Sequence, residues 1–138
     1  METLVVMLME KDPETGVFSN EVGSYSIQEH GNLVEGIYLI HKEEQDLVYL
    51  KLTTDRDVAD WEYDAILDYY DMDALKDMVL TIEESEGYNP VWEVSFRFMD
   101  SQDGMENLLT TILQKHRYIL DEVFEAIKDK KAEYEEQE

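Results

Sequence analysis

Six short apolar stretches of the chain predict the strands of a sheet. In the last of them Trp92, Val94 and Phe96 alternate with polar residues, which is the pattern of a strand with one buried face. The first is nearly continuous, and it predicts a central strand buried on both faces. The predicted strands span residues 3–11, 23–29, 33–43, 46–54, 77–85 and 91–99.

The connections between these stretches are short and polar, as expected between antiparallel neighbours. Pro13 and Gly16 predict a reversal after the first strand, because they suit the backbone angles of a turn. We therefore expect the first four strands to form a meander. The last two strands, joined by the loop 86–90, should form a hairpin.

Two segments repeat their apolar residues every three or four positions and predict helices. The first covers residues 57–72, with Thr54 or Asp55 as its N-cap. The second runs from about residue 103 to about residue 135. The acidic tail, from about residue 132 to 138, is predicted to fray.

These elements predict a single α+β domain over residues 1–138. We expect an antiparallel sheet of about six strands, made of the four-strand meander, a helix and the two-strand hairpin, packed against a long C-terminal helix. Both helices should cover the same face of the sheet. The alternative is a sheet that curls into a barrel around the last helix.

The charge of the chain narrows the classes of function. The sequence holds 34 acidic and 11 basic residues, a net charge of −23, which repels nucleic acid and anionic lipid and attracts basic proteins. We therefore expect no direct nucleic-acid binding and no membrane association. The sequence has no cysteine, which excludes thiol catalysis and agrees with a cytoplasmic location.

The helix predicted over residues 57–72 carries the densest candidate surface. On a helical wheel its carboxylates form a ridge beside an aromatic stripe that should pack on the sheet. Like charges three or four positions apart oppose a helix by roughly 0.2–0.5 kcal/mol per pair, so the ridge either serves a partner or is only the solvated side. The stripe consists of Val58, Trp61, Ala65, Tyr69 and Met72. The candidate partner-binding residues are Asp57, Asp60, Asp64, Asp68, Asp71, Trp61, Tyr63 and Tyr70.

Specific catalytic and metal chemistry finds little support in the sequence. We find no zinc-protease, nucleophile-elbow, phosphate-loop or dinucleotide motif, and we expect no cofactor. Carboxylates along one helix do not converge, so loose association of Ca²⁺ or Mg²⁺ is expected rather than a specific metal site. His116 lies on the apolar stripe of the last helix and should be hydrogen-bonded core, with a general base as the alternative.

The basic residues are unevenly distributed along the chain. Residues 115–138 hold five basic and eight acidic residues, whereas residues 1–114 hold six and twenty-six. The last helix could therefore form ion pairs with the acidic helix, within the chain or across a homodimer. A homodimer through the C-terminal helix is one expectation.

The stretches "LKLTTDRDVADWEYDAILDYYD" and "EGYNPVWEVSFRF" resemble a family of small acidic proteins of unknown function from clostridia-like bacteria. The likeness runs along most of the chain. It implies a bacterial, cytosolic protein and no particular functional residues.

The sequence favours a non-enzymatic protein-binding module that presents the helix over residues 57–72 to a basic partner. Narrower versions are a phosphate-mimicking inhibitor of a nucleic-acid-binding protein and a protein that neutralises a basic toxin. The competing class is a small-ligand binder or enzyme with a pocket between the sheet and the C-terminal helix, lined by Tyr88, Trp92 and His116.

Overall fold

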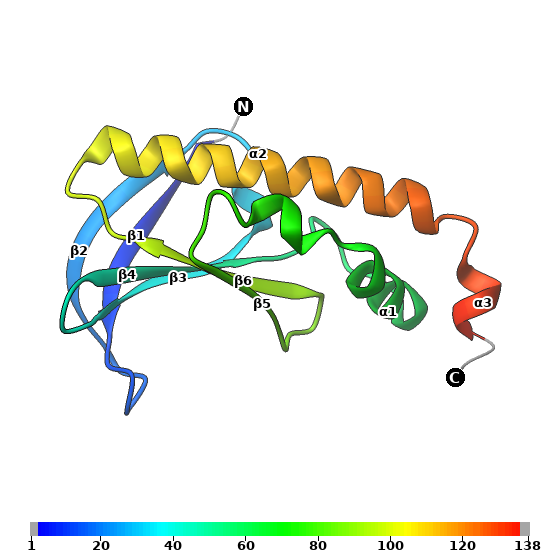
Figure 1. Cartoon of the computed structure of the whole chain (residues 1–138), viewed down its shortest axis with the longest axis horizontal. Helices are drawn as coiled ribbons and strands as arrows, with labels where there is room; N and C mark the ends of the chain where they lie inside the picture. Colours follow the sequence, from blue (N-terminus) through cyan, green and yellow to red (C-terminus); the bar gives the residue numbers. More distant parts are fainter. Residues whose placement is uncertain (1–2, 136–138) are drawn as a thin grey trace.

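A computed structural model of the chain describes residues 3–135 and shows an α+β fold with a six-stranded sheet and three α-helices in that range. Figure 1 shows the longest helix lying across the sheet, with the two shorter helices beyond the ends of the strands. The strands are β1 (Leu4–Lys11), β2 (Phe18–Ile27), β3 (Val34–His41), β4 (Asp46–Leu52), β5 (Thr81–Ser85) and β6 (Val91–Arg97). The α-helices are α1 (Asp60–Tyr69), α2 (Gln102–Ile127) and α3 (Lys131–Glu135), and two 3₁₀ turns are η1 (Gly31–Leu33) and η2 (Met72–Leu75).

The strand order is β2-β1-β3-β4-β6-β5, so the predicted four-strand meander is wrong. Strand β3 pairs with β1 instead of β2, and it does so in parallel, which makes the sheet mixed. The predicted hairpins β1–β2 and β5–β6 are both present and antiparallel. In the first turn Gly16 has φ +75°, and its N–H donates to the Asp12 carbonyl at 2.8 Å.

The crossover from β2 to β3 explains the altered order. Strand β2 ends beside the start of β1, where Ile27 pairs with Leu4. The chain then passes over that end of β1 through η1, and a Cβ on Gly31 would lie 2.9 Å from the Leu4 side chain. Because Leu33 in the same turn is fully buried, the crossover is anchored in the core. The chain therefore enters β3 on the far side of β1.

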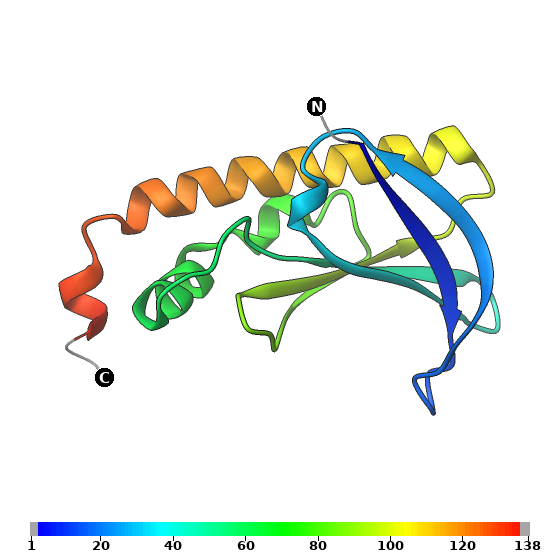
Figure 2. The ribbon, with the colours of Figure 1, turned by 180° about the vertical axis from the view of Figure 1, so that it is seen from behind.

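Strand β1 is central in the sheet, but the prediction that both of its faces are buried is wrong. Val6 and Leu8 are buried, whereas Val5 and Met7 are 61% and 56% exposed. The register joins β1 to β3 through one pair, Glu10 with Leu39. Figure 2 shows β1 and β2 rising together from their turn and diverging from the rest of the sheet toward α2. Among residues 3–135, no helix covers the outer face of β1, where Val5 and Met7 lie (Figure 2).

Helix α2 covers the inner face of the sheet and completes the core. Its buried residues recur at three- and four-residue spacing, as predicted. The Ser101 hydroxyl caps the N-terminus of the helix by accepting the Gly104 N–H at 3.0 Å. The helix ends at Ile127, earlier than predicted, and α3 follows. The buried residues of α2 are Met105, Leu109, Ile112, Leu113, His116, Ile119, Leu120, Val123 and Ile127. The residues of the sheet that they face include Val48, Leu50, Leu52, Trp92, Val94 and Phe96.

Helix α1 does not cover the sheet, contrary to the prediction that both helices would. It packs against α2 and α3, beyond the ends of the strands (Figure 1). The predicted tail 132–138 lies partly outside the described residues; its described part belongs to α3, where the Tyr134 hydroxyl donates to Asp68 at 2.8 Å. Helix α2 therefore packs on α1 as well as on the sheet.

The sheet curls toward α2 but remains open, so the barrel alternative does not hold. Its edge strands are β2 and β5. The first turns of α2 reach the edge of β2: the Gln102 side chain donates to the Ser24 carbonyl at 2.8 Å, and the Ser26 N–H donates to Glu106 at 2.6 Å. None of the helices in residues 3–135 combines the length and the apolar character that spanning a membrane requires.

Candidate functional site

Helix α1 is shorter than its prediction, and this changes where the acidic residues lie. Asp60, Asp64 and Asp68 are on the helix, whereas Asp57 precedes it and Asp71 follows it. The N-cap is Ala59 rather than Thr54 or Asp55, and the Glu62 carboxylate accepts its N–H at 2.9 Å. The five aspartates are all exposed, as a partner-binding surface requires.

The aromatic residues near this surface are distributed differently from the prediction. Trp61 and Tyr63 are half-buried, and the Tyr63 hydroxyl donates to the Gly87 carbonyl at 3.1 Å. Tyr69 is 42% exposed, but Tyr70 is only 6% exposed, so a partner cannot reach it. The helix ends at Tyr69, and Tyr70, with ψ 125°, is extended and points into the core. The predicted stripe therefore does not hold at Tyr69.

The basic residues of the described chain do not neutralise the five aspartates. Within residues 3–135 no lysine or arginine forms an ion pair with any of them. Arg56 pairs with Glu62 at 2.8 Å, and Arg117 pairs with Asp55 at 2.7 Å. The contact of Arg117 is the one ion pair that joins α2 to the segment before α1 in the described chain. The lysines of residues 128–131 pair within their own part of the chain.

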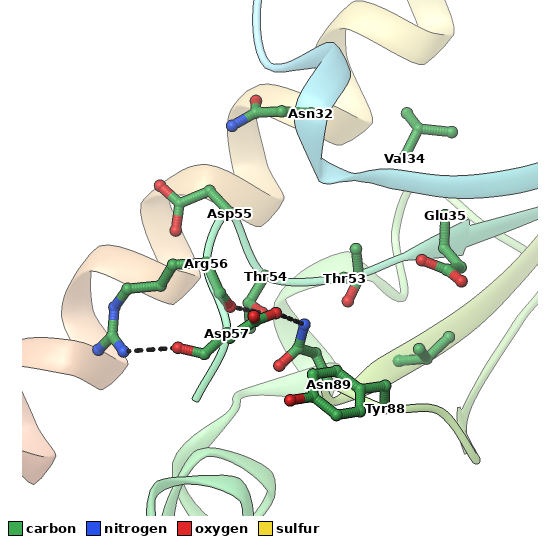
Figure 3. A pocket seen from close by; sticks show the side chains of 11 residues that line it. Asn32, Val34, Glu35, Thr53, Thr54, Asp55, Arg56, Asp57, Tyr88 and Asn89 are labelled. Carbon is green, nitrogen blue, oxygen red and sulfur yellow. Dashed lines mark hydrogen bonds between the residues drawn. The ribbon is translucent and has the colours of Figure 1, made fainter. Parts of the chain in front are cut away.

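A cavity of about 380 Å³ opens beside this surface, between the segment after β4 and the loop before β6 (Figure 3). Asp57, one of the five exposed aspartates, also lies in the wall of the cavity. The lining residues are Asn32, Val34, Glu35, Thr53, Thr54, Asp55, Arg56, Asp57, Tyr88, Asn89 and Val91, and we call this cavity the loop pocket. It brings together the two stretches, "TTDRD" and "EGYNP", that carry the family resemblance.

Hydrogen bonds hold the two walls of the loop pocket in place. The Thr53 hydroxyl donates to the Pro90 carbonyl at 2.9 Å. Asn89 accepts the Val58 N–H at 3.1 Å and donates to Asp57 at 3.0 Å. Because both segments are tied together by side chains, the pocket is formed before any ligand arrives.

Behind the pocket lies a buried group of three rings, Tyr70, Trp92 and His116, which we call the central cluster. Tyr70 stacks on Trp92 with ring centroids 4.0 Å apart. The His116 Nε2 is 2.8 Å from the Thr53 carbonyl, which can only accept, so Nε2 carries the proton and donates. Nδ1 then accepts from the Tyr70 hydroxyl at 2.7 Å. His116 thus links the core to the wall of the pocket.

The surroundings of His116 keep its imidazole neutral. Burial lowers its pKa to about 4, and the nearby Arg117 acts in the same direction. Burial also raises the pKa of Tyr70. The predicted role of His116 as hydrogen-bonded core is therefore confirmed. The pocket predicted for Tyr88, Trp92 and His116 does not form, because Trp92 and His116 are fully buried and Tyr88 is 84% exposed.

A second histidine lies in a different setting, at the far end of β1. The His41 Nε2 is 2.7 Å from Glu10, and its Nδ1 is 2.6 Å from Asp46. We call these three residues the strand-end cluster. The hydrogen bonds to Glu10 and Asp46 raise the pKa of His41. The two carboxylates contact different nitrogens, and no group of three or more acidic or histidine side chains in residues 3–135 is arranged to hold a metal ion.

Comparison with known proteins gives one match. A model of a family of unknown function, DUF6762, matches residues 1–135. The chain belongs to this family. No curated protein and no solved structure matches it. The family match confirms the resemblance to uncharacterised proteins, while the clostridial origin stays a prediction.

Proposed function

We propose that the protein is a non-enzymatic binding module that presents α1 and its flanking residues to a basic surface of another protein. The observation that supports this proposal is the set of exposed aspartates that no cation of the described chain neutralises. We call Asp57, Asp60, Asp64, Asp68 and Asp71 the acidic surface.

The negative charges of the acidic surface repel one another and so destabilise helix α1, which carries three of them. Asp60, Asp64 and Asp68 follow one another at four-residue spacing on α1, where like charges destabilise a helix. Arg56 and Arg117 lie nearby but are engaged with Glu62 and Asp55. A basic partner would relieve the repulsion, and the field of a strongly acidic chain would speed its approach.

Exposed aromatic rings accompany the acidic surface. Tyr69 is 42% exposed on α1, and Tyr88 is 84% exposed at the loop pocket. Aromatic residues bordered by charged ones are typical of protein interfaces, because the rings contribute contact area while the charges select the partner. In this proposal Tyr69 takes the part that the sequence suggested for Tyr70.

The test uses a short peptide of alternating lysine and glycine and measures its affinity by isothermal titration calorimetry. The double variant Asp60→Asn and Asp64→Asn should weaken binding by roughly tenfold, because two ion pairs are lost. The matched control is Glu43→Gln with Glu44→Gln, which removes the same charge from the exposed turn after β3. If both double variants weaken binding equally, only net charge matters and the proposed surface is wrong.

A further inference from the structure

The loop pocket presents hydrogen-bond acceptors on its buried wall. Thr53 and Thr54 are 7% and 4% exposed, and both belong to the lining. The Thr53 hydroxyl gives its hydrogen to the Pro90 carbonyl, and the Thr54 hydroxyl gives its hydrogen to the Arg56 carbonyl at 2.8 Å. A hydroxyl that has donated its only hydrogen keeps oxygen lone pairs, so it can only accept from a ligand.

The charged side chains that line the pocket also favour a ligand that donates hydrogen bonds. Asp55 is neutralised by Arg117 at 2.7 Å, and Arg56 is engaged with Glu62. The guanidinium of Arg56 also lies 4.5 Å from the centre of the Phe124 ring on α2, and Figure 3 shows its side chain directed away from the labelled residues around Thr53. Among the described residues, the lining carboxylates that have no ion-pair partner are therefore Glu35 and Asp57.

Asn89 and Tyr88 complete the pocket. Asn89 uses its oxygen for the Val58 N–H and one amide hydrogen for Asp57. Tyr88 is 84% exposed in the lining, and the face of an aromatic ring attracts cations. Acceptor oxygens, two carboxylates with a net negative charge and an aromatic ring together suit a group that is positive and donates several hydrogen bonds.

We propose that the loop pocket binds the cationic head of a lysine or arginine side chain of the partner. The inference rests on the proposed function, and it adds one specific anchoring site to a surface that otherwise acts through its charge. The cavity of about 380 Å³ is in the range of pockets that hold small ligand groups. Asp57 links the two features, because it lies on the acidic surface and in the pocket.

The experiment combines the Lys/Gly peptide with amide chemical shifts measured by NMR. Addition of the peptide should shift the amide signals of Thr53, Thr54 and Asn89. Glu35→Gln and Asp57→Asn should each weaken the affinity for the peptide by roughly tenfold, because each removes one charge-assisted hydrogen bond. An asparagine at position 57 keeps an oxygen that can accept from Asn89, so the loop should stay in place. Glu44→Gln, on a distant exposed turn, is the matched control.

The outcomes separate this inference from the proposed function. If the double variant Asp60→Asn with Asp64→Asn weakens peptide binding and Glu35→Gln does not, the proposed acidic surface is supported and the proposed ligand site in the loop pocket is wrong. The pocket stands without the acidic surface if the control double variant weakens peptide binding as much as Asp60→Asn with Asp64→Asn does, while Glu35→Gln weakens it more than Glu44→Gln does and the Thr53 and Asn89 signals shift. If spermidine shifts these signals and the peptide does not, the pocket takes a free polyamine and the proposed side-chain ligand is wrong.

Discussion

The central cluster and the strand-end cluster each contain a histidine, but they hold it in opposite ways. His116 is fully buried, with one hydroxyl and one carbonyl as its partners, and burial lowers its pKa to about 4. His41 lies at the surface between two carboxylates, which raise its pKa. The same side chain is a neutral hydrogen-bonding element in one region and, when protonated, a cation that links two carboxylates in the other. The comparison shows that burial with neutral partners lowers the pKa of a histidine, whereas carboxylate partners at the surface raise it.

The largest expected effect comes from removing the buried imidazole. His116→Ala should lower the free energy of unfolding by about 4 kcal/mol, because it opens a cavity and leaves Tyr70 and the Thr53 carbonyl without their partner. Chemical denaturation measures this loss. The matched control is His41→Ala, which should cost less than about 1 kcal/mol because its ion pairs are exposed. Equal losses at the two positions would contradict the comparison.

The pH dependence of the two histidines should differ in sign. When the pH falls below 6.5, the ordinary histidine pKa, His116 is protonated in the unfolded chain. In the folded chain it stays neutral until the pH reaches about 4. The stability that neutral His116 provides is therefore complete above pH 6.5 and falls by about 3 kcal/mol as the pH drops to about 4. In an NMR titration the ring signals of His116 should stay unchanged through the range in which those of His41 shift. A shift of His116 near pH 6.5 would show that it is not buried as described.

A smaller effect should follow from removing the hydroxyl of Tyr70. Tyr70→Phe keeps the ring that stacks on Trp92 but leaves Nδ1 of His116 without a donor, which should cost about 2 kcal/mol. The measurement is the denaturation midpoint followed by tryptophan fluorescence. Tyr69→Phe, on the exposed neighbour, is the control and should change little. An unchanged denaturation midpoint in Tyr70→Phe would mean that the hydrogen bond to His116 contributes nothing to stability.

The smallest effect is expected at the strand-end cluster. The raised pKa of His41 means that its contribution is complete below pH 6.5 and is lost as the pH rises through the folded-state pKa. Around pH 6, His41→Gln should lower the free energy of unfolding by less than about 1 kcal/mol, since the pairs are exposed. The difference from the unchanged protein should shrink as the pH rises through the folded-state pKa of His41 and vanish above it. Glu10 and Asp46 raise this pKa, and Lys11, Asp12 and Glu14 are the other charged residues around the same surface cavity. A difference that persists unchanged at high pH would contradict the protonated bridge.

Much of the fold follows from residue periodicity, but the order of the strands does not. The alternation at Trp92, Val94 and Phe96 and the spacing along α2 indicated their buried faces, and both are confirmed. The crossover that carries the chain to β3 beside β1 passes close to Leu4 at Gly31, a long-range contact that no local pattern encodes. A pattern of period two shows which face is buried, but it does not show which strand lies alongside.

The candidate site was predicted only in part, for a similar reason. The exposed aspartates followed from the helical wheel, but the end of α1 places Tyr70 in the core, where an uninterrupted helix would have kept it on its surface. The loop pocket was missed because Glu35, Thr53 and Asn89 come from segments far apart in the sequence. The available signal was the pair Thr53 and Thr54, two hydroxyl residues directly after a buried strand. A homodimer through the C-terminal helix stays a prediction.

The contacts between the start of α2 and strand β2 have a consequence for how the protein behaves at high concentration. An open strand edge is a template on which another chain can add, and the bonds from Gln102 and Glu106 occupy that edge at Ser24 and Ser26. The other end of the same strand lacks such cover among the described residues, and there Phe18 is 53% exposed. The net charge of −23 keeps copies apart at neutral pH. Near the isoelectric point of about 4.2 that repulsion disappears, and aggregation should then begin at the uncovered end of β2.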